Sequence, residues 1–298
     1  MAMAARATRS ASRKARATEA VATGPLGALC HDELGVIFDG LADPLQPVVA
    51  VALSSTCLGL RTPLKAVLEV LKERHGRATA LCRKMGTSCV ELRERMSLNW
   101  AHLTVDDVAT LGMILRTRGL PKLQTLCPSG WFGDEGMSAL CEGLSDGAAP
   151  SVRTLTFMYN KIGPAGAEVL AAALRRGAMP KLEKLVVVLN PIGKQGFAAL
   201  APSLRKLPAI HTMILRQCGM CDEGMASLFG NLDKDEFKEL KRLEITSNAT
   251  IDHSCALLIA AVKAGSLPAI DFVEVEGWPT ELHDAINRAI AHRLKGVT

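Results

Sequence analysis

Aromatic residues and long apolar runs are both scarce in this sequence of 298 residues. Three Trp, one Tyr and seven Phe make up 4% of the chain, which argues against a nucleic-acid-binding protein that works by base stacking. The longest apolar runs, at residues 48–53 and 255–262, are far shorter than the roughly 18 residues of a membrane-spanning helix. A hydrophobic content of 48% excludes a wholly disordered chain. The composition therefore predicts a folded protein with a substantial core.

Positive charge is concentrated in residues 1–24. This segment has five Lys or Arg residues against one acidic residue, Glu19, and so carries +4 of the overall charge of +5. The nearly neutral remainder has no excess positive charge with which to bind phosphate backbones. The segment lacks the apolar core of a secretory signal, so we interpret it as a disordered basic tail, with an organelle transit peptide as the alternative. We expect a cytoplasmic or nuclear protein, and organelle import stays open.

The nine cysteines, without a secretory signal, indicate a reducing compartment. Cys218 and Cys221 form the one C-x-x-C motif, but no second pair stands at zinc-site spacing. The histidines are scattered, and His211 is expected to be a surface residue of a strand. No P-loop, zinc-protease or nucleophile-elbow motif occurs. We therefore predict no catalytic, metal-binding or cofactor-binding residue, and structural roles for both thiols.

A motif of proline followed by x-apolar-x-x-apolar recurs along the chain. It begins at Pro121, Pro150, Pro180, Pro208 and Pro268. These prolines are 29, 30, 28 and 60 residues apart, and a copy without proline at residues 240–245 divides the last interval. A fixed period of about 30 residues predicts a stack of structural repeats.

Each repeat has the same internal pattern. A stretch with the alternation of a short strand is followed by a glycine-containing turn and then by a helix rich in small residues, such as 166–176 or 196–207. The alternating stretch ends at Asn160, Asn190, Cys218 and Asn248. A strand and a helix in every unit predict an α/β solenoid.

The pattern L-x-x-L-x-L-x-x-N/C-x-L resembles the ribonuclease-inhibitor type of leucine-rich repeat over residues 96–278. The resemblance implies parallel strands that line a concave face, with helices outside. It also implies that the Asn or Cys side chain bonds free backbone groups in the turn, which explains Cys218 without metal or redox chemistry. In the first unit, Pro128 and Trp131 stand where an apolar strand residue and Asn are expected, so we expect a distorted strand there.

Both ends of a solenoid need caps. Residues 279–298 place Leu282, Ile286, Ile290 and Leu294 on one helix face, which predicts a capping helix, with a membrane-binding or partner-binding helix as the alternative. Residues 25–95 are predicted to form a helical block, in which Ser88 and Glu91 have capping-box spacing. Two acidic pairs, at 106–107 and 134–135, are expected to open helices.

Residues 29–44 resemble the opening of an F-box, and residues 53–60 resemble its later helix. Cys30 replaces the proline of the motif, the segment between the two stretches is longer, and the final tryptophan is absent. The resemblance implies binding to the Skp-type adaptor of a cullin–RING ubiquitin ligase. The adaptor-binding residues would be Leu29, Ile37, Phe38, Leu41 and Pro44. The alternative is a plain N-terminal cap.

In the resembled fold, the strand residues between the leucines point to the concave face. We predict the following partner-binding residues: Met158, Tyr159, Lys184, Val186, Val188, Leu189, Ile214, Arg216, Arg242, Glu244, Phe272 and Glu274. The middle of this strip is apolar and charges flank it, which is typical of an interaction patch. Strand propensity, or packing against the chain's own tail, is the alternative explanation.

These patterns predict a non-catalytic protein-recognition module that binds neither nucleic acid nor membrane. The F-box-like segment followed by repeats favours a substrate receptor of an SCF-type ubiquitin ligase, whose partners would include the adaptor and the cullin. The alternatives are a stand-alone repeat scaffold and, more distantly, a GTPase activator of the Ran type.

Overall fold

The computed structural model describes residues 36–37, 41–56, 65–117, 119–144, 147–246, 248, 255–275 and 280–295. The chain packs as two compact units, Met1–Ala80 and Leu81–Thr298. The predicted division into 1–24, 25–95, 96–278 and 279–298 stays a prediction. Its basic tail lies outside the described residues.

The first unit is helical where it is described. It contains α3 (Val48–Thr56) and most of α5 (Lys65–Lys84), which ends in the second unit. Ala50 and Leu71 are buried. His75 Nδ1 lies 2.7 Å from the carbonyl oxygen of Pro44 and so ties α5 to the segment that precedes α3.

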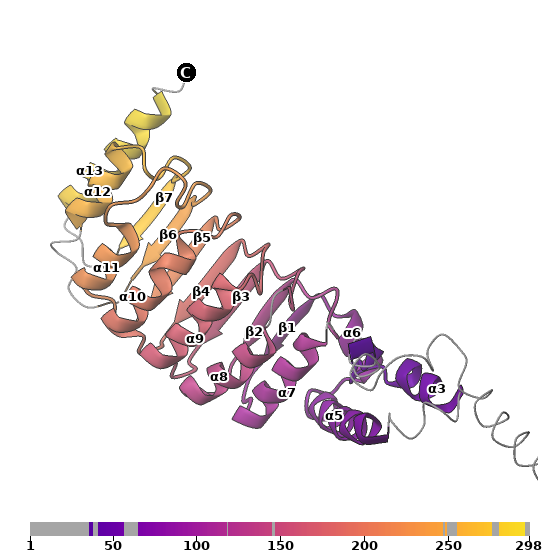
Figure 1. The fold of residues 1–298 in the computed structure, drawn as a ribbon. Coiled ribbons are helices and arrows are strands. Elements are labelled where there is room, and N and C mark those ends of the chain that lie inside the picture. Colours follow the sequence, from indigo (N-terminus) through magenta and orange to yellow (C-terminus); the bar gives the residue numbers. More distant parts are fainter. Residues whose placement is uncertain are drawn as a thin grey trace, which may run out of the picture. The chain divides into compact units, whose positions relative to one another are not determined.

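The second unit is built on one sheet of seven parallel strands in the order β1 to β7 (Figure 1). The strands are β1 (Ser97–Trp100), β2 (Thr125–Pro128), β3 (Thr154–Met158), β4 (Lys184–Val188), β5 (Thr212–Arg216), β6 (Arg242–Ile245) and β7 (Phe272–Val275). The helices that alternate with them are α7 (Val105–Arg116), α8 (Gly133–Gly143), α9 (Pro164–Arg175), α10 (Gly193–Leu204), α11 (Asp222–Phe229), α12 (Cys255–Lys263) and α13 (Thr280–Lys295), and α6 (Cys89–Glu94) precedes β1. Each strand pairs with its neighbours in sequence and the helices lie along one side of the sheet, which confirms the predicted leucine-rich-repeat solenoid.

The leucine positions of the repeat form the core. Leu155, Leu185 and Met213 are paired across β3, β4 and β5, and all three are fully buried. Full burial of a side chain of this size stabilises the fold by about 1.5–3 kcal/mol. The row continues into the neighbouring strands. The apolar residues that recur about every 30 positions therefore form a continuous layer between the sheet and the helices.

The asparagine positions form a ladder of buried hydrogen bonds. Asn190 Oδ1 accepts hydrogen bonds from the backbone N–H groups of Asn160 (3.2 Å) and Ile162 (3.0 Å) in the preceding unit. Its Nδ2 donates to the carbonyls of Phe157 and Val188. Asn248 makes the equivalent contacts two units further on, to the backbone N–H of Cys218 among others. One amide side chain thus satisfies the turn of one unit and fastens it to the next.

Cys218 occupies a position in this ladder. Its Sγ lies 3.2 Å from the carbonyl oxygen of Val187 and 3.1 Å from that of Arg216, and its single S–H is shared between them. These are the positions to which Asn190 Nδ2 donates one unit earlier. Burial raises the pKa of the Cys218 thiol to about 12. The group is therefore an uncharged thiol that serves the turn, as the resemblance implies.

The repeat that starts at Pro121 departs from the others, as expected. Strand β2 pairs with β3 only through Thr125 and Leu126. Gly130, not Trp131, faces the ladder: its N–H donates to Asn160 Oδ1 at 3.0 Å. A Cβ at Gly130 would lie 2.0 Å from the carbonyl oxygen of Leu103, so only glycine permits this approach. Trp131, which stands at the asparagine position when residues are counted from the leucines, is instead 66% exposed.

Several predicted helix ends are confirmed. Ser88 and Glu91 form a capping box at the start of α6, and Thr104 and Asp107 form another at the start of α7. At the other end of the chain, α13 buries Ile286 and Ile290, as expected for the capping helix. The side chains of Leu282 and Leu294 lie outside the described part. Within the described residues, no helix combines the length and apolarity needed to cross a lipid bilayer.

Candidate protein-binding face

The predicted partner-binding residues lie on the sheet face opposite the core. Strand pairing places Val186 beside Ile214, and Ile214 beside Glu244, in a row that continues to Glu274 on β7. Side chains in this row alternate along each strand with the buried leucine positions, because successive residues of a strand point to opposite faces. The strands therefore bring residues about 30 positions apart in sequence into one surface.

The apolar part of this surface lies over β3, β4 and β5. Met158 is 37% exposed and Tyr159 is 52% exposed. The following residues are half-buried and complete this part, which we call the apolar strip: Val186, Val188, Leu189 and Ile214. Val188 pairs directly with Met158, so the exposed and half-buried members are contiguous.

Backbone geometry holds the ends of the apolar strip. Tyr159 and Leu189 both have φ of 55°, a left-handed conformation that costs residues with side chains about 1–3 kcal/mol. The N–H of Tyr159 donates to the carbonyl of Val188 at 3.1 Å, and the N–H of Leu189 donates to the carbonyl of Arg216 at 2.9 Å. The repeated left-handed turn thus directs one side chain per unit away from the ladder, and hydrogen bonds to the next unit fix it.

A charged cluster borders the strip on β5, β6 and β7. The carboxylate of Glu244 contacts the guanidinium of Arg216 and accepts a hydrogen bond from Arg242 Nε at 2.6 Å. Arg216 also approaches Glu274 at 3.7 Å, and the guanidinium of Arg242 lies 4.0 Å from the ring centre of Phe272. The predicted flanking charges therefore form one connected group.

Glu244 is the member whose position the sequence did not reveal. Its side chain is only 3% exposed, whereas those of Arg216 and Arg242 are 43% and 45% exposed. Burial opposes ionisation of Glu244, but hydrogen bonds and charge from both arginines outweigh it and lower the pKa of the carboxyl group. Glu244 is thus a buried anion that fixes two half-exposed cations on the concave face.

Trp131 and Lys161 add a surface feature that the sequence reasoning missed. Lys161 Nζ lies 5.0 Å above the centre of the Trp131 ring, a cation–π contact between successive units. Both residues have positive φ, and Lys161 follows Tyr159 by two positions. The sequence did contain a sign of this feature: a tryptophan at a turn position outside the strand is expected on the surface and not in the core.

Three of the five predicted adaptor-binding residues lie within the described part. Ile37 is 39% exposed and Leu41 is 36% exposed. Pro44 is buried, so its side chain would shape this segment and not contact a partner directly. Leu29 and Phe38 lie outside the described residues.

Two residues that we weighed for chemistry have ordinary surroundings. His211 precedes β5 and does not lie within it as expected, and its Nε2 is 3.7 Å from Glu183 Oε2. The Sγ of Cys221 donates to Glu223 Oε2 at 2.8 Å, away from the ladder contacts of Cys218. Among the described residues, no three or more His, Cys, Asp or Glu side chains converge as a metal site.

Comparison with protein-family models agrees with the repeat assignment. A family model described as Leucine Rich repeat matches residues 148–171, which contain β3 and the first part of α9. Among solved structures, the chain is similar to the leiomodin-1 actin-binding site 2 with a TM-score of 0.38 and 10% identity, over 44% of this chain and 73% of that one. It is also similar to the Caenorhabditis elegans tropomodulin C-terminal domain with a TM-score of 0.33 and 10% identity, over 75% of this chain and 95% of that one. No curated protein sequence matches the chain.

The register of the strands, the asparagine ladder and the matched repeat together show the fold of a leucine-rich-repeat solenoid. Solenoids of this kind present an extended curved surface to other molecules. The fold is therefore that of a protein-interaction module.

Proposed function

We propose that the chain binds a protein partner on its concave face, with the apolar strip at the centre of the contact. The observation that carries the proposal is the contiguity of Met158, Val188 and Ile214 with their neighbours on the face opposite the core. A folded protein that leaves such a set of side chains partly accessible has apolar area to bury against a partner.

The composition of the face supports a few strong contacts over many weak ones. Tyr and Arg are among the residues that most often dominate binding energy, and they do so where surrounding contacts exclude water. Tyr159 lies at one border of the strip, and Arg216 lies at the other, held by Glu244. Because Glu244 already holds the Arg216 side chain in place, this side chain loses less conformational entropy when a partner binds.

The test compares two aspartate substitutions in the same strand. Val188→Asp places a charge in the strip and should weaken partner binding by about 2 kcal/mol or more, which is about thirtyfold in Kd. Its melting temperature should stay close to that of the wild type, because changes outside the core usually cost within about 0.5 kcal/mol. Leu185→Asp buries an unpaired carboxylate in the core and should unfold the repeats.

Partners would be captured with the full chain as bait and identified by mass spectrometry, and their affinity would then be measured with purified proteins. Ala198→Asp is the matched control, since Ala198 is exposed on α10, outside the sheet, in the same repeat. Early melting of Val188→Asp, comparable with that of Leu185→Asp, would show that the strip belongs to the core. Equal loss of affinity in Ala198→Asp and Val188→Asp would remove the concave face from the proposal.

We further propose that the first unit recruits a Skp-type adaptor, so that the chain serves as a substrate receptor of a cullin–RING ubiquitin ligase. The F-box-like pattern of residues 29–44 supports this role, as does the exposure of Ile37 and Leu41. Ile37→Asp should abolish binding to the purified adaptor, because desolvating a carboxylate without a partner costs several kcal/mol. Val48→Asp, on the exposed side of α3, is the control. A wild-type chain that does not bind the adaptor would leave a stand-alone repeat scaffold as the function.

A further inference from the structure

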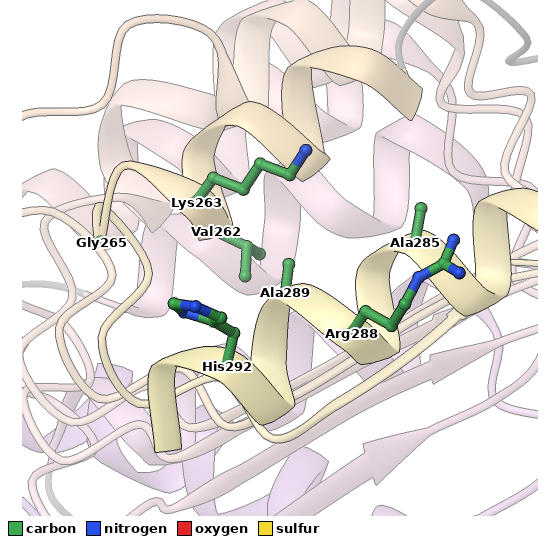
Figure 2. Close-up of a pocket in the computed structure, with 7 residues that line it drawn as sticks. All are labelled: Val262, Lys263, Gly265, Ala285, Arg288, Ala289 and His292. Atoms are coloured by element: carbon green, nitrogen blue, oxygen red, sulfur yellow. The ribbon is translucent and has the colours of Figure 1, made fainter. Parts of the chain in front are cut away.

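Helices α12 and α13 enclose a groove of about 590 Å³ at the C-terminal end of the solenoid (Figure 2). Its volume is within the range of sites that bind small molecules. The residues that line it belong to neither the concave strip nor the F-box-like segment, so the groove is separate from the surfaces of the proposed function.

The floor of the groove is apolar and made of small side chains. Val262 of α12 and Ala289 of α13 are buried where the two helices meet, and Ala285 lies one turn before Ala289. Figure 2 shows Val262 and Ala289 facing the space between the two helices. Because alanine ends at Cβ, the floor leaves room that a larger side chain would fill.

Three nitrogen-bearing side chains form the rim: Lys263 from α12, and Arg288 and His292 from α13. Arg288 and His292 are four residues apart and so lie on the same side of their helix, on either side of Ala289 (Figure 2). Among the described residues that line the groove, none is acidic. Asp284, one turn before Arg288, is exposed, and in the described part of the chain no ion pair joins an acidic residue to any of the three.

The turn after α12 keeps the groove accessible. Gly265 has φ of 74° and lines the groove just beyond the end of the helix. A Cβ built at this position would meet no atom within 4 Å, so this side is open space. The preference of cations for a helix C-terminus accounts for Lys263 at the end of α12 and for His292 in the last turn of α13. It does not account for Arg288, which lies nearly two turns before the end of α13 and lines the same groove.

We infer that this groove binds a small amphipathic anion, with a carboxylate or phosphate head on a short apolar chain. Arg288 offers a planar pair of donors that suits either head group, and Lys263 adds a point charge. The apolar floor formed by Val262, Ala285 and Ala289 would take the chain, since burial of each methylene group is favourable. An inorganic anion would contact the rim but would leave the apolar floor uncovered. A cation with an apolar tail would be repelled by the positive charges of Lys263 and Arg288.

Isothermal titration calorimetry on the full chain, with four probes, tests this site. Hexanoate and hexyl phosphate each combine an anionic head with an alkyl tail. Inorganic phosphate lacks the alkyl tail, and hexylammonium carries the tail with a positive charge. We expect saturable binding of one of the two amphipathic anions, at one molecule per chain. A preference for hexanoate would identify a carboxylate ligand, and a preference for hexyl phosphate would identify a phosphate ligand, and either supports the site.

Variants then locate the binding. The double variant Lys263→Gln/Arg288→Gln should lower the affinity for the preferred anion by about tenfold or more, because charge-assisted hydrogen bonds are stronger than neutral ones. The control double variant Arg175→Gln/Lys181→Gln removes the same charge from exposed positions of an earlier repeat, where Arg175 ends α9 as Lys263 ends α12. It should bind as the wild type does. Ala285→Phe should also weaken binding by filling the floor, and thermal melting verifies that each variant is folded.

Four results would overturn the inference. These are no saturable binding of either amphipathic anion, equal binding of hexylammonium, binding of inorganic phosphate as tight as that of hexyl phosphate, and unchanged affinity in the variant without Lys263 and Arg288. None of them bears on Val188→Asp, so the concave-face proposal is tested separately.

Discussion

Removing the amide of Asn190 gives the most direct measure of what the ladder contributes to stability. The side chain is 1% exposed, and its Oδ1 is the acceptor for two buried N–H groups, of Asn160 and Ile162. In Asn190→Ala both N–H groups lose this partner, whereas the carbonyl of Val188 keeps the N–H of Tyr159. The loss therefore falls mainly on two buried donors.

The size of the effect follows from those two donors. A buried donor left without a partner costs about 1–3 kcal/mol, so Asn190→Ala should lower the free energy of unfolding by about 4 kcal/mol. This is a large part of the 5–15 kcal/mol that is typical of a folded domain. Asn190→Cys should cost about half as much, because a thiol, a weak donor and acceptor, already holds this position at Cys218.

Urea-induced unfolding, followed by far-ultraviolet circular dichroism, measures both substitutions. Asn99→Ala is the control, since Asn99 is an exposed residue of β1 and should shift the free energy of unfolding by no more than about 0.5 kcal/mol. An effect of Asn190→Ala as small as that of Asn99→Ala would show that water or a backbone shift replaces the amide. The ladder would then not be what fastens one unit to the next.

Three further outcomes are expected. Because the arginines hold the pKa of Glu244 below its ordinary value of 4.5, its ionised form stabilises the fold above that pH, and the stabilisation is lost as the pH falls through the lowered pKa. Acid titration of stability should therefore show a steeper loss below pH 4.5 for the wild type than for Glu244→Gln, and parallel curves would contradict this. Cys218 should resist iodoacetamide in the native protein and react only after unfolding, whereas the half-exposed Cys221 should react first. Peptide mass spectrometry measures the order of labelling, and faster labelling of Cys218 would show that it is a reactive redox thiol. Thr104→Ala removes the N-cap of α7 and should cost about 1 kcal/mol in urea unfolding, and an unchanged midpoint would mean that the capping box is dispensable.

The repeat architecture could be predicted because its signal is periodic and repeated. Each unit places leucines, an asparagine or cysteine, and a glycine-containing turn at the same spacing, so errors in one unit are corrected by the next. Cys218 is an example: the resemblance to the leucine-rich repeat implied that its side chain bonds backbone groups of the turn, and the contacts to Val187 and Arg216 agree with it. Capping boxes were also readable, because they depend on residues three apart in sequence.

The repeat that starts at Pro121 shows where such reasoning fails. Counting from the leucines places Trp131 at the asparagine position, but this unit is one residue shorter between strand and turn, and Gly130 faces the ladder. The controlling contact is the close approach of Gly130 to the backbone of Leu103, in the preceding turn. A contact between backbones of two units leaves no side-chain pattern in the sequence. The glycine itself was the only sign.

The charged border of the concave face illustrates a second limit, and it bears on function. Strand alternation correctly assigns Arg216, Arg242 and Glu244 to one face, but alternation does not tell how deeply each lies. Depth depends on the long side chains packed around it: Arg216 from the neighbouring strand and Arg242 from the same strand both contact Glu244, while their own side chains stay half-exposed. A partner would therefore meet the outer edges of two arginines whose charge is partly neutralised from within. Such a border would select partners by the direction of the free N–H donors of the two arginines more than by net charge. Partner affinity at this end of the face should therefore depend only weakly on salt concentration.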